Sequence, residues 1–247
     1  MANWQDPQMT GASAATVGVP RAARDAGLRS YMLSVYNYMA SGVLLTGIVA
    51  LLFAPYAANV LINETGRGLS GLGWIVTLAP LAFVMVMSFG INRISTGTLQ
   101  LLFWSFAAVM GLSMSTVFIA YTGVSIATTF FAVTAAFLGL SLFGYTTKKD
   151  LNAFGTFLIM GVVGLLVAML INLFLQSPAM QLAISAIGVL LFAGLTAYDT
   201  QKIKSMYYHV AGSDMMGKVV IMGALNLYLD FINMFLFLLR LFGSARD

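Results

Sequence analysis

Cysteine is absent from this chain of 247 residues, and charged side chains are scarce. Without cysteine the chain can form no disulfide bond, no thiolate metal site and no cysteine nucleophile. Asp, Glu, Lys and Arg make up only 8% of the residues, whereas soluble domains carry about 25%. Hydrophobic residues make up 60%. This composition excludes an ordinary soluble domain and predicts an integral membrane protein, with the lipid bilayer as its surroundings.

Several enzyme classes are excluded because the residues they need are missing or misplaced. The single histidine, His209, falls in an expected loop, which argues against a Ser–His site within the membrane. A retinal protein needs a lysine inside the last span, and Lys218 lies only just before the start of that span. An intramembrane aspartyl protease would fit Tyr198-Asp199, but Leu-Tyr-Leu precedes Asp230 where Gly-x-Gly is needed. No phosphate-binding glycine loop or zinc motif is present, so we expect neither enzymatic activity nor a cofactor.

The net charge of +4 does not indicate a nucleic-acid partner, because no basic cluster is interleaved with aromatic residues. Basic residues kept on the cytoplasmic side of a membrane explain this charge better. The first 30 residues lack the apolar run of a signal peptide and are rich in Ala, Gly, Ser, Thr and Arg. We expect residues 1–27 to be a disordered tail and residues 28–247 to be one membrane domain.

Seven hydrophobic segments follow, each about the length that a helix needs to cross a bilayer, roughly 20 residues. They span residues 31–54, 74–92, 99–121, 124–145, 154–175, 179–203 and 219–243. The fourth segment is rich in Thr and could instead be re-entrant, but it carries no charge, which favours a full span. The predicted fold class is therefore all-α, a bundle of seven transmembrane helices.

The distribution of basic residues predicts the orientation of this bundle. Nine of the twelve fall on one side: Arg21, Arg24, Arg29, Arg93, Lys148, Lys149, Lys202, Lys204 and Lys218. The other side has Arg67, Arg240 and Arg246. The richer side is expected to be cytoplasmic, which puts the N-terminus in the cytoplasm and the C-terminus outside. An odd number of spans requires this separation of the termini.

The last hydrophobic segment carries a carboxylate near its middle, Asp230, at a cost of about 2.5–3.5 kcal/mol on insertion scales. Helical spacing places Gly223, Asn226, Asp230 and Asn233 on one face. The opposite face is Leu, Phe, Ile and Met, so we expect one side toward lipid. The polar seam formed by Asn226, Asp230 and Asn233 must instead face protein or water, since hydrocarbon cannot satisfy it.

Asp199, near the end of the sixth segment, is the other carboxylate within the late spans. A short loop joins the two segments, so Asp199 and Asp230 could meet, share one proton and respond to pH. Each acid also has a purely structural alternative. Asp199 could lie at the membrane interface and pair with exposed Lys202, and Asp230 could only hold two helices together. Depth is an obstacle, because Asp230 lies about 16 Å along its helix and Asp199 only about 6 Å from its helix end.

Arg93 ends the second segment on the same side of the membrane. It could extend to the lipid headgroups. It could instead pair with one of the two acids.

These residues resemble those of a known family, the bacterial branch of the Bax inhibitor-1 family. The late motif Tyr198-Asp199-x-x-x-Ile203-Lys204 and the last-helix run 225–233, LNLYLDFIN, carry the resemblance, with the ending 239–243, LRLFG. The stretches 28–32 and 148–151 fit as well, so the resemblance covers about 28–243.

The resemblance implies a seven-helix fold with a pore plugged near the cytoplasmic side and a bacterial inner-membrane location. It implies that Asp199 and Asp230 form a pH-sensing pair and that Arg93 interacts with this pair. Family members are described as calcium-leak channels, so a pH-gated cation leak, with calcium the expected ion, is the predicted function. The alternative is a regulator that transports nothing and binds another membrane protein, such as an AAA protease.

One position departs from the family pattern. Some bacterial relatives carry an acid in the second helix that helps to hold calcium, and Ala82 occupies the equivalent position here. Calcium prefers six to eight oxygen ligands. A calcium site built from Asp199 and Asp230 would therefore need backbone carbonyls and water as well.

Overall fold

The computed structural model describes residues 21–63 and 68–246, and this part of the chain forms eight helices. They are α1 (Arg21–Leu61), α2 (Gly71–Gly90), α3 (Thr96–Met114), α4 (Val117–Ala120), α5 (Gly123–Thr146), α6 (Asn152–Leu175), α7 (Pro178–Val210) and α8 (Met216–Phe242). Within these residues seven spans are long and apolar enough to cross a membrane, with α3 and α4 sharing one. The predicted all-α fold with seven spans is confirmed. The fourth segment is the 24-residue helix α5, in agreement with a full span.

Hydroxyl side chains fix where four of the helices begin. The side chains of Ser70, Ser95, Thr122 and Ser177 each accept a hydrogen bond from the backbone N–H three residues later. Such N-caps satisfy donors that a helix start would otherwise leave free. Gln176 ends α6 in the left-handed conformation with φ of 51°, and Pro178 starts α7 two residues on. The α6–α7 connection is consequently very short.

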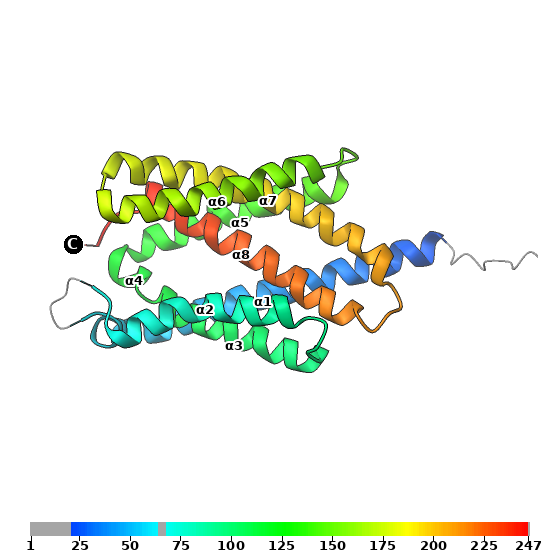
Figure 1. The fold of residues 1–247 in the computed structure, drawn as a ribbon, viewed down its shortest axis with the longest axis horizontal. Coiled ribbons are helices and arrows are strands. Elements are labelled where there is room, and N and C mark those ends of the chain that lie inside the picture. The colour runs from blue at the N-terminus through cyan, green and yellow to red at the C-terminus, as the bar shows by residue number, and fades with distance from the viewer. Residues whose placement is uncertain (1–20, 64–67, 247) are drawn as a thin grey trace, which may run out of the picture.

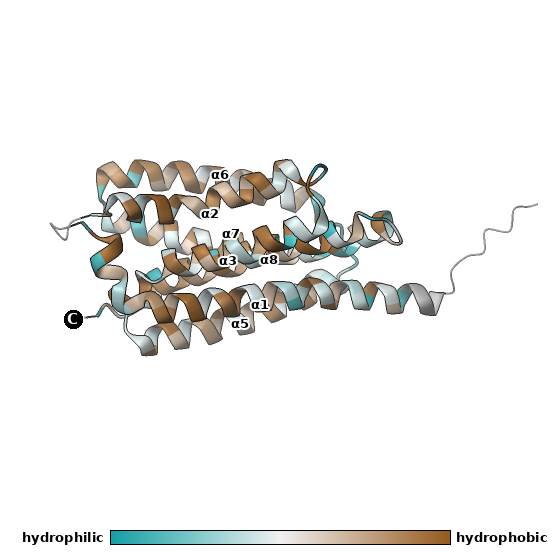
Figure 2. Ribbon diagram, turned by 90° about the horizontal axis from the view of Figure 1, so that it is seen from below, coloured by the Kyte–Doolittle hydropathy of each residue, from teal (hydrophilic) through white to brown (hydrophobic). Residues whose placement is uncertain are grey.

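Two helices are longer than the hydrophobic segments predicted. Helix α1 already begins at Arg21, and most of the predicted tail, 1–20, lies outside the described residues. Helix α7 continues seven residues past Ile203 to Val210. His209 is therefore in the last turn of α7 and exposed, and its predicted loop position was wrong. The hydropathy pattern starts later in α1 and ends earlier in α7 because residues 21–30 and 204–210 are rich in polar side chains. Figure 2 shows the start of α1 projecting beyond the other helices.

Helix α8 runs through the middle of the molecule. Figure 1 shows α5, α6 and α7 on one side, α1, α2 and α3 on the other, and α8 crossing between them. Its neighbours are α7, α1, α5 and α3. In its most apolar stretch 72% of residues are buried, against 17–39% in the other spans. The expected lipid-facing side of α8 was wrong. Lipid tails are as apolar as a protein core, so the sequence pattern alone could not distinguish the two.

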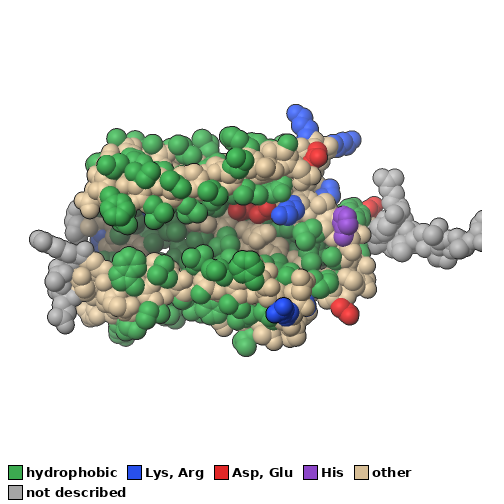
Figure 3. All heavy atoms as spheres, in the orientation of Figure 1, with side chains coloured by type: hydrophobic (Ala, Val, Ile, Leu, Met, Phe, Trp, Pro, Cys, Tyr) green, Lys and Arg blue, Asp and Glu red, His purple; other side chains and the backbone are tan. Residues whose placement is uncertain are grey.

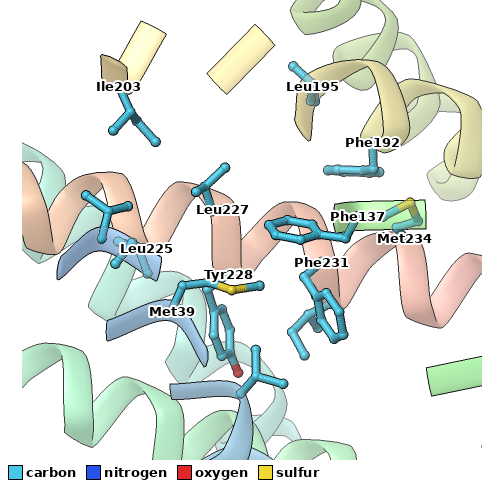
Figure 4. Packing of buried hydrophobic residues seen from close by; sticks show 14 of the residues in the cluster. Met39, Phe137, Phe192, Leu195, Ile203, Leu225, Leu227, Tyr228, Phe231 and Met234 are labelled. Carbon is cyan, nitrogen blue, oxygen red and sulfur yellow. The ribbon is translucent and has the colours of Figure 1, made fainter. Parts of the chain in front are cut away.

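Aromatic and aliphatic side chains pack around α8 in the core. Figure 4 shows Tyr228 of α8 beside Met39 of α1 and Phe231 near Phe137 of α5, with the labelled side chains of α7 on the other side of α8. The rings of Phe137 and Phe231 have centroids 5.7 Å apart, and those of Phe106 and Tyr228 are 5.1 Å apart. The Tyr228 hydroxyl is hydrogen-bonded to Thr46 at 2.7 Å, so this buried polar atom has a partner. The packing fixes α8 against both halves of the bundle.

Basic side chains gather at the end of the bundle where α7 turns into α8, which we call the basic end (Figure 3). There Lys204 Nζ donates to the carbonyl of Tyr145 at 2.7 Å, and Lys218 Nζ donates to that of Ile91 at 3.0 Å. Both carbonyls end helices, α5 and α2, where a cation is favourable. Arg240 and Arg246 lie at the opposite end, where Arg246 donates to the carbonyl of Phe118. Arg67 lies outside the described residues.

The predicted orientation can be tested directly because the chain has no cysteine of its own. Ser213→Cys places a thiol in the exposed α7–α8 turn at the basic end, and Ser244→Cys places one at the opposite end. In intact cells a membrane-impermeant maleimide should label Ser244→Cys and leave Ser213→Cys unlabelled. After lysis it should label both. The reverse pattern in intact cells would mean that the basic end faces outward.

Candidate functional site

Asp199 of α7 and Asp230 of α8 lie side by side inside the bundle, and their side chains are within hydrogen-bonding reach of each other. Asp230 is only 4% exposed, whereas Asp199 is half-buried. The extension of α7 to Val210 removes the difficulty of depth. Asp199 lies eleven residues from that end and Asp230 fourteen residues from the start of α8. These are about 16 Å and about 21 Å along the two helices.

The pair is poor in compensating groups. Among the described residues, Asp230 Oδ2 is buried without a hydrogen-bond partner. The nearest cation acting on Asp199 is Lys202, one turn later in α7, and its exposed ammonium also lies 5.7 Å from the centroid of the Tyr198 ring. A buried oxygen without a partner is costly. Ionised carboxylates cannot donate hydrogen bonds, so a proton shared between Asp199 and Asp230 is the group that could satisfy this oxygen.

Arg93 is not brought to the pair. It lies exposed in the turn between α2 and α3, and its backbone N–H donates to the carbonyl of Gly90. The groups that act on the two aspartates are each other and Lys202. Helix α2 packs mainly against α3 and α1, away from α7. The expected pairing of Arg93 with the acids is absent from this conformation, and its position fits the alternative of a side chain directed to the lipid headgroups.

Asn226 and Asn233 lie on the least buried side of α8. Both are half-buried and belong to a stripe of half-buried residues at helical spacing, Met222, Asn226, Leu229, Asn233 and Leu236. Asn233 Nδ2 donates to the carbonyl of Leu229 at 2.8 Å. Figure 3 shows a hollow between the two halves of the bundle, with acidic side chains inside it. The two asparagines of the polar seam thus lie on the side of α8 that its neighbours leave partly uncovered, whereas Asp230 itself is buried.

A chain of hydrogen-bonded hydroxyl groups lies next to Asp199, and the sequence did not predict it. Tyr36 of α1 is hydrogen-bonded to Ser141 of α5 at 2.5 Å, and Ser141 is hydrogen-bonded to Thr200 of α7 at 3.0 Å. Thr200 also donates to the carbonyl of Thr196 at 2.8 Å. Single hydroxyl groups inside apolar spans were the available signal, but sequence cannot say which of them meet. The chain ties α1 and α5 to α7 at the residue after Asp199.

Glycines allow two helices to approach α7 just before Asp199. A Cβ atom on Gly144 of α5 would lie 2.2 Å from the backbone oxygen of Ala197. A Cβ atom on Gly155 of α6 would lie 2.2 Å from the ring of Tyr198. Both glycines are buried within their helices. Small residues permit such close helix contacts in membranes. The backbone that carries Asp199 is therefore held on two sides.

Six spans around a seventh, buried central span and an acid pair between the last two helices define an integral, multi-pass membrane protein with a polar site in its core. The sequence profile of the family described as "Inhibitor of apoptosis-promoting Bax1" matches residues 28–247. The chain therefore belongs to the Bax inhibitor-1 family, as the sequence motifs predicted.

Bacterial relatives agree with this assignment. The inner membrane protein YbhL of Escherichia coli (strain K12) is 46% identical over 223 residues, covering 90% of this chain and 94% of its own. A protein of Rickettsia prowazekii is 48% identical over 225 residues, covering 90% and 93%. A membrane protein of Streptococcus pyogenes is 34% identical over 220 residues, covering 89% and 94%. These names agree with the predicted location in a bacterial inner membrane.

Proposed function

We propose that this protein is a passive cation leak whose opening is controlled by the protonation state of Asp199 and Asp230, with the deprotonated pair open. One observation carries the proposal: two carboxyl groups from different helices meet in the core, and one buried oxygen of Asp230 has no hydrogen-bond partner among the described residues. Intramembrane acids are costly and typically mark ion or proton pathways. The proposal includes no enzymatic step, no cofactor and no nucleic-acid partner.

The proposed gate works through the bond between α7 and α8. With one proton on the pair, one carboxyl group donates a hydrogen bond to the other and holds the two helices together. Loss of that proton leaves two negative charges in contact, which repel strongly in a poorly solvated interior. We expect α7 and α8 to separate there, because the half-buried stripe of α8 that includes Asn226 and Asn233 is already partly uncovered. The leak should then rise as the pH rises.

The proposed cargo is a cation, with calcium as the expected ion. Two ionised carboxylates attract a divalent cation, but no group of three or more acidic, His or Cys side chains that could hold a metal occurs within residues 21–63 and 68–246. Calcium takes six to eight oxygen ligands, so water and carbonyl groups would have to complete its shell. Weak, transient binding of this kind suits passage of an ion better than storage.

The test is a flux assay with the purified full-length chain in liposomes that contain a calcium-sensitive dye. Calcium is added outside, and dye fluorescence is followed at several pH values from 5 to 8, with protein-free liposomes as the baseline. We expect entry above the baseline and faster entry at higher pH. Entry equal to the baseline at every pH would refute the leak. It would then favour the regulator, which capture of a membrane protease with the chain would support.

A further inference from the structure

A long furrow runs along the bundle between α1 and α5, on the side of α8 away from the hollow in Figure 3. Figure 2 shows α1 and α5 on the same side of the molecule. Three adjoining hollows share lining residues: the first two share Tyr36 and Leu138, and the second and third share Val43, Phe130 and Phe231. The first two measure about 420 Å³ and about 390 Å³. We call this the α1–α5 furrow.

The furrow carries polar groups among apolar side chains at one end and is apolar beyond it. Its mouth, at the basic end, is lined by Arg29, Tyr36, Ser141 and Tyr145. Lys204 lies beside the mouth, with Nζ 4.6 Å from the centroid of the Tyr145 ring. Deeper in, the lining is almost wholly aliphatic and aromatic. A cationic mouth that leads into an apolar channel matches an amphiphile with an anionic head.

Arg29 is available to such a head. Its side chain is exposed, and no ion pair joins it to a carboxylate anywhere in the described part of the chain. Asp25, one turn earlier in α1, is exposed and does not pair with it. A guanidinium group binds phosphate through two parallel hydrogen bonds. Tyr36 and Ser141 already bond to each other, so the phenol of Tyr145 is the further donor at the mouth.

The length of the furrow also fits a lipid. From Arg29 to Ala40, which lines the second hollow, eleven residues of α1 rise about 16 Å. Half of a hydrocarbon core of about 30 Å is about 15 Å. One acyl chain would therefore follow the furrow from its mouth to Ala40 with its head at the level of Arg29.

We propose that the α1–α5 furrow binds an anionic phospholipid, with the phosphate on Arg29 and one acyl chain along the furrow toward Ala40. This site is separate from the acid pair and does not depend on the proposed leak. The bound chain would lie against Phe137 and Phe231, two residues of the core around α8. A specific lipid would thereby fill a gap that α1 and α5 leave between them.

Native mass spectrometry of the purified full chain tests the proposal. Phosphatidylglycerol and phosphatidylcholine with identical acyl chains are offered in equal amounts. We expect preferential retention of phosphatidylglycerol, and Arg29→Gln should lower that preference about fivefold, the factor for one basic residue near an anionic surface. Arg240→Gln, at the opposite end, should leave it unchanged. Arg29 is exposed, so its replacement does not endanger the fold.

The acyl chain is tested separately. Ala40→Trp fills the furrow and should reduce retention of both lipids, while Ala136→Trp, on an exposed part of α5 that does not line the furrow, should not. Glycerol phosphate has the phosphate of the lipid headgroup but no acyl chain. It should neither be retained by the protein nor compete with phosphatidylglycerol for binding. Equal retention of the two lipids, no effect of Arg29→Gln, or no difference between the two tryptophan variants would each overturn the proposal. Competition by glycerol phosphate against phosphatidylglycerol would mean that the site recognises phosphate alone, and it would also overturn the proposal of a lipid site.

Discussion

Replacing Asp230 with Asn is expected to give a calcium leak that is slow and no longer changes with pH. The Asn amide donates a hydrogen bond to the Asp199 carboxylate without needing a proton, so α7 and α8 stay together at every pH. For the unaltered chain, loss of one proton should change the open population about tenfold per pH unit across the steep part of its titration. The measurement is calcium entry into dye-filled liposomes at pH 5 to 8.

Asp199→Asn should behave in the same way, because either carboxyl group can supply the exchangeable proton. Asp214→Asn is the matched control, since Asp214 is an exposed acid in the turn between the same two helices. It should keep the full pH response. If both pair variants retained the pH response of the unaltered chain, the gate would not be this pair, even with the leak intact.

The second large effect is expected from a single methyl group at Gly144. Gly144→Ala puts a Cβ atom 2.2 Å from the backbone oxygen of Ala197, a distance that real contacts do not reach. Neither backbone can yield locally, so α5 and α7 must move apart and the contact between Ser141 and Thr200 must stretch. Overpacking typically costs about 1–3 kcal/mol, and a backbone obstacle belongs at the upper end. The measurement is the midpoint of thermal unfolding in detergent.

Gly139→Ala provides the control on the same helix. A Cβ atom there meets no atom within 4 Å, and alanine favours a helix over glycine by about 0.5–1 kcal/mol. Its unfolding midpoint should stay the same or rise, while that of Gly144→Ala falls clearly. Equal midpoints for the two variants would mean that α5 and α7 are less tightly apposed at Ala197.

Much of this arrangement could be predicted because the bilayer imposes simple rules on the sequence. Seven apolar runs of sufficient length predicted seven spans, and the structure confirms them. The cost of a charge in hydrocarbon singled out Asp199 and Asp230 among the late residues, and α7 and α8 bring the two together. The energetic cost of a charge in hydrocarbon predicts where these acids lie, since an acid inside a span must contact protein or water.

The rest depended on contacts that a linear pattern does not encode. The apolar face of α8 packs on protein rather than lipid, because both surroundings accept the same residues. Arg93 lies in the turn that follows its segment and is not among the groups that act on the pair. The meeting of Tyr36, Ser141 and Thr200 joins residues up to 164 positions apart. Only the relative rotation of three helices decides whether such hydroxyl groups meet.

The central place of α8 has a consequence for how the chain is made. The helix that both halves share is synthesised after the other six described spans, so those six enter the membrane before their common partner exists. Until residues 216–242 insert, Met39, Phe106 and Phe137 have no α8 side chains to pack against. A chain cut short before Met216 should therefore be cleared by quality-control proteases, although every one of its own spans can insert.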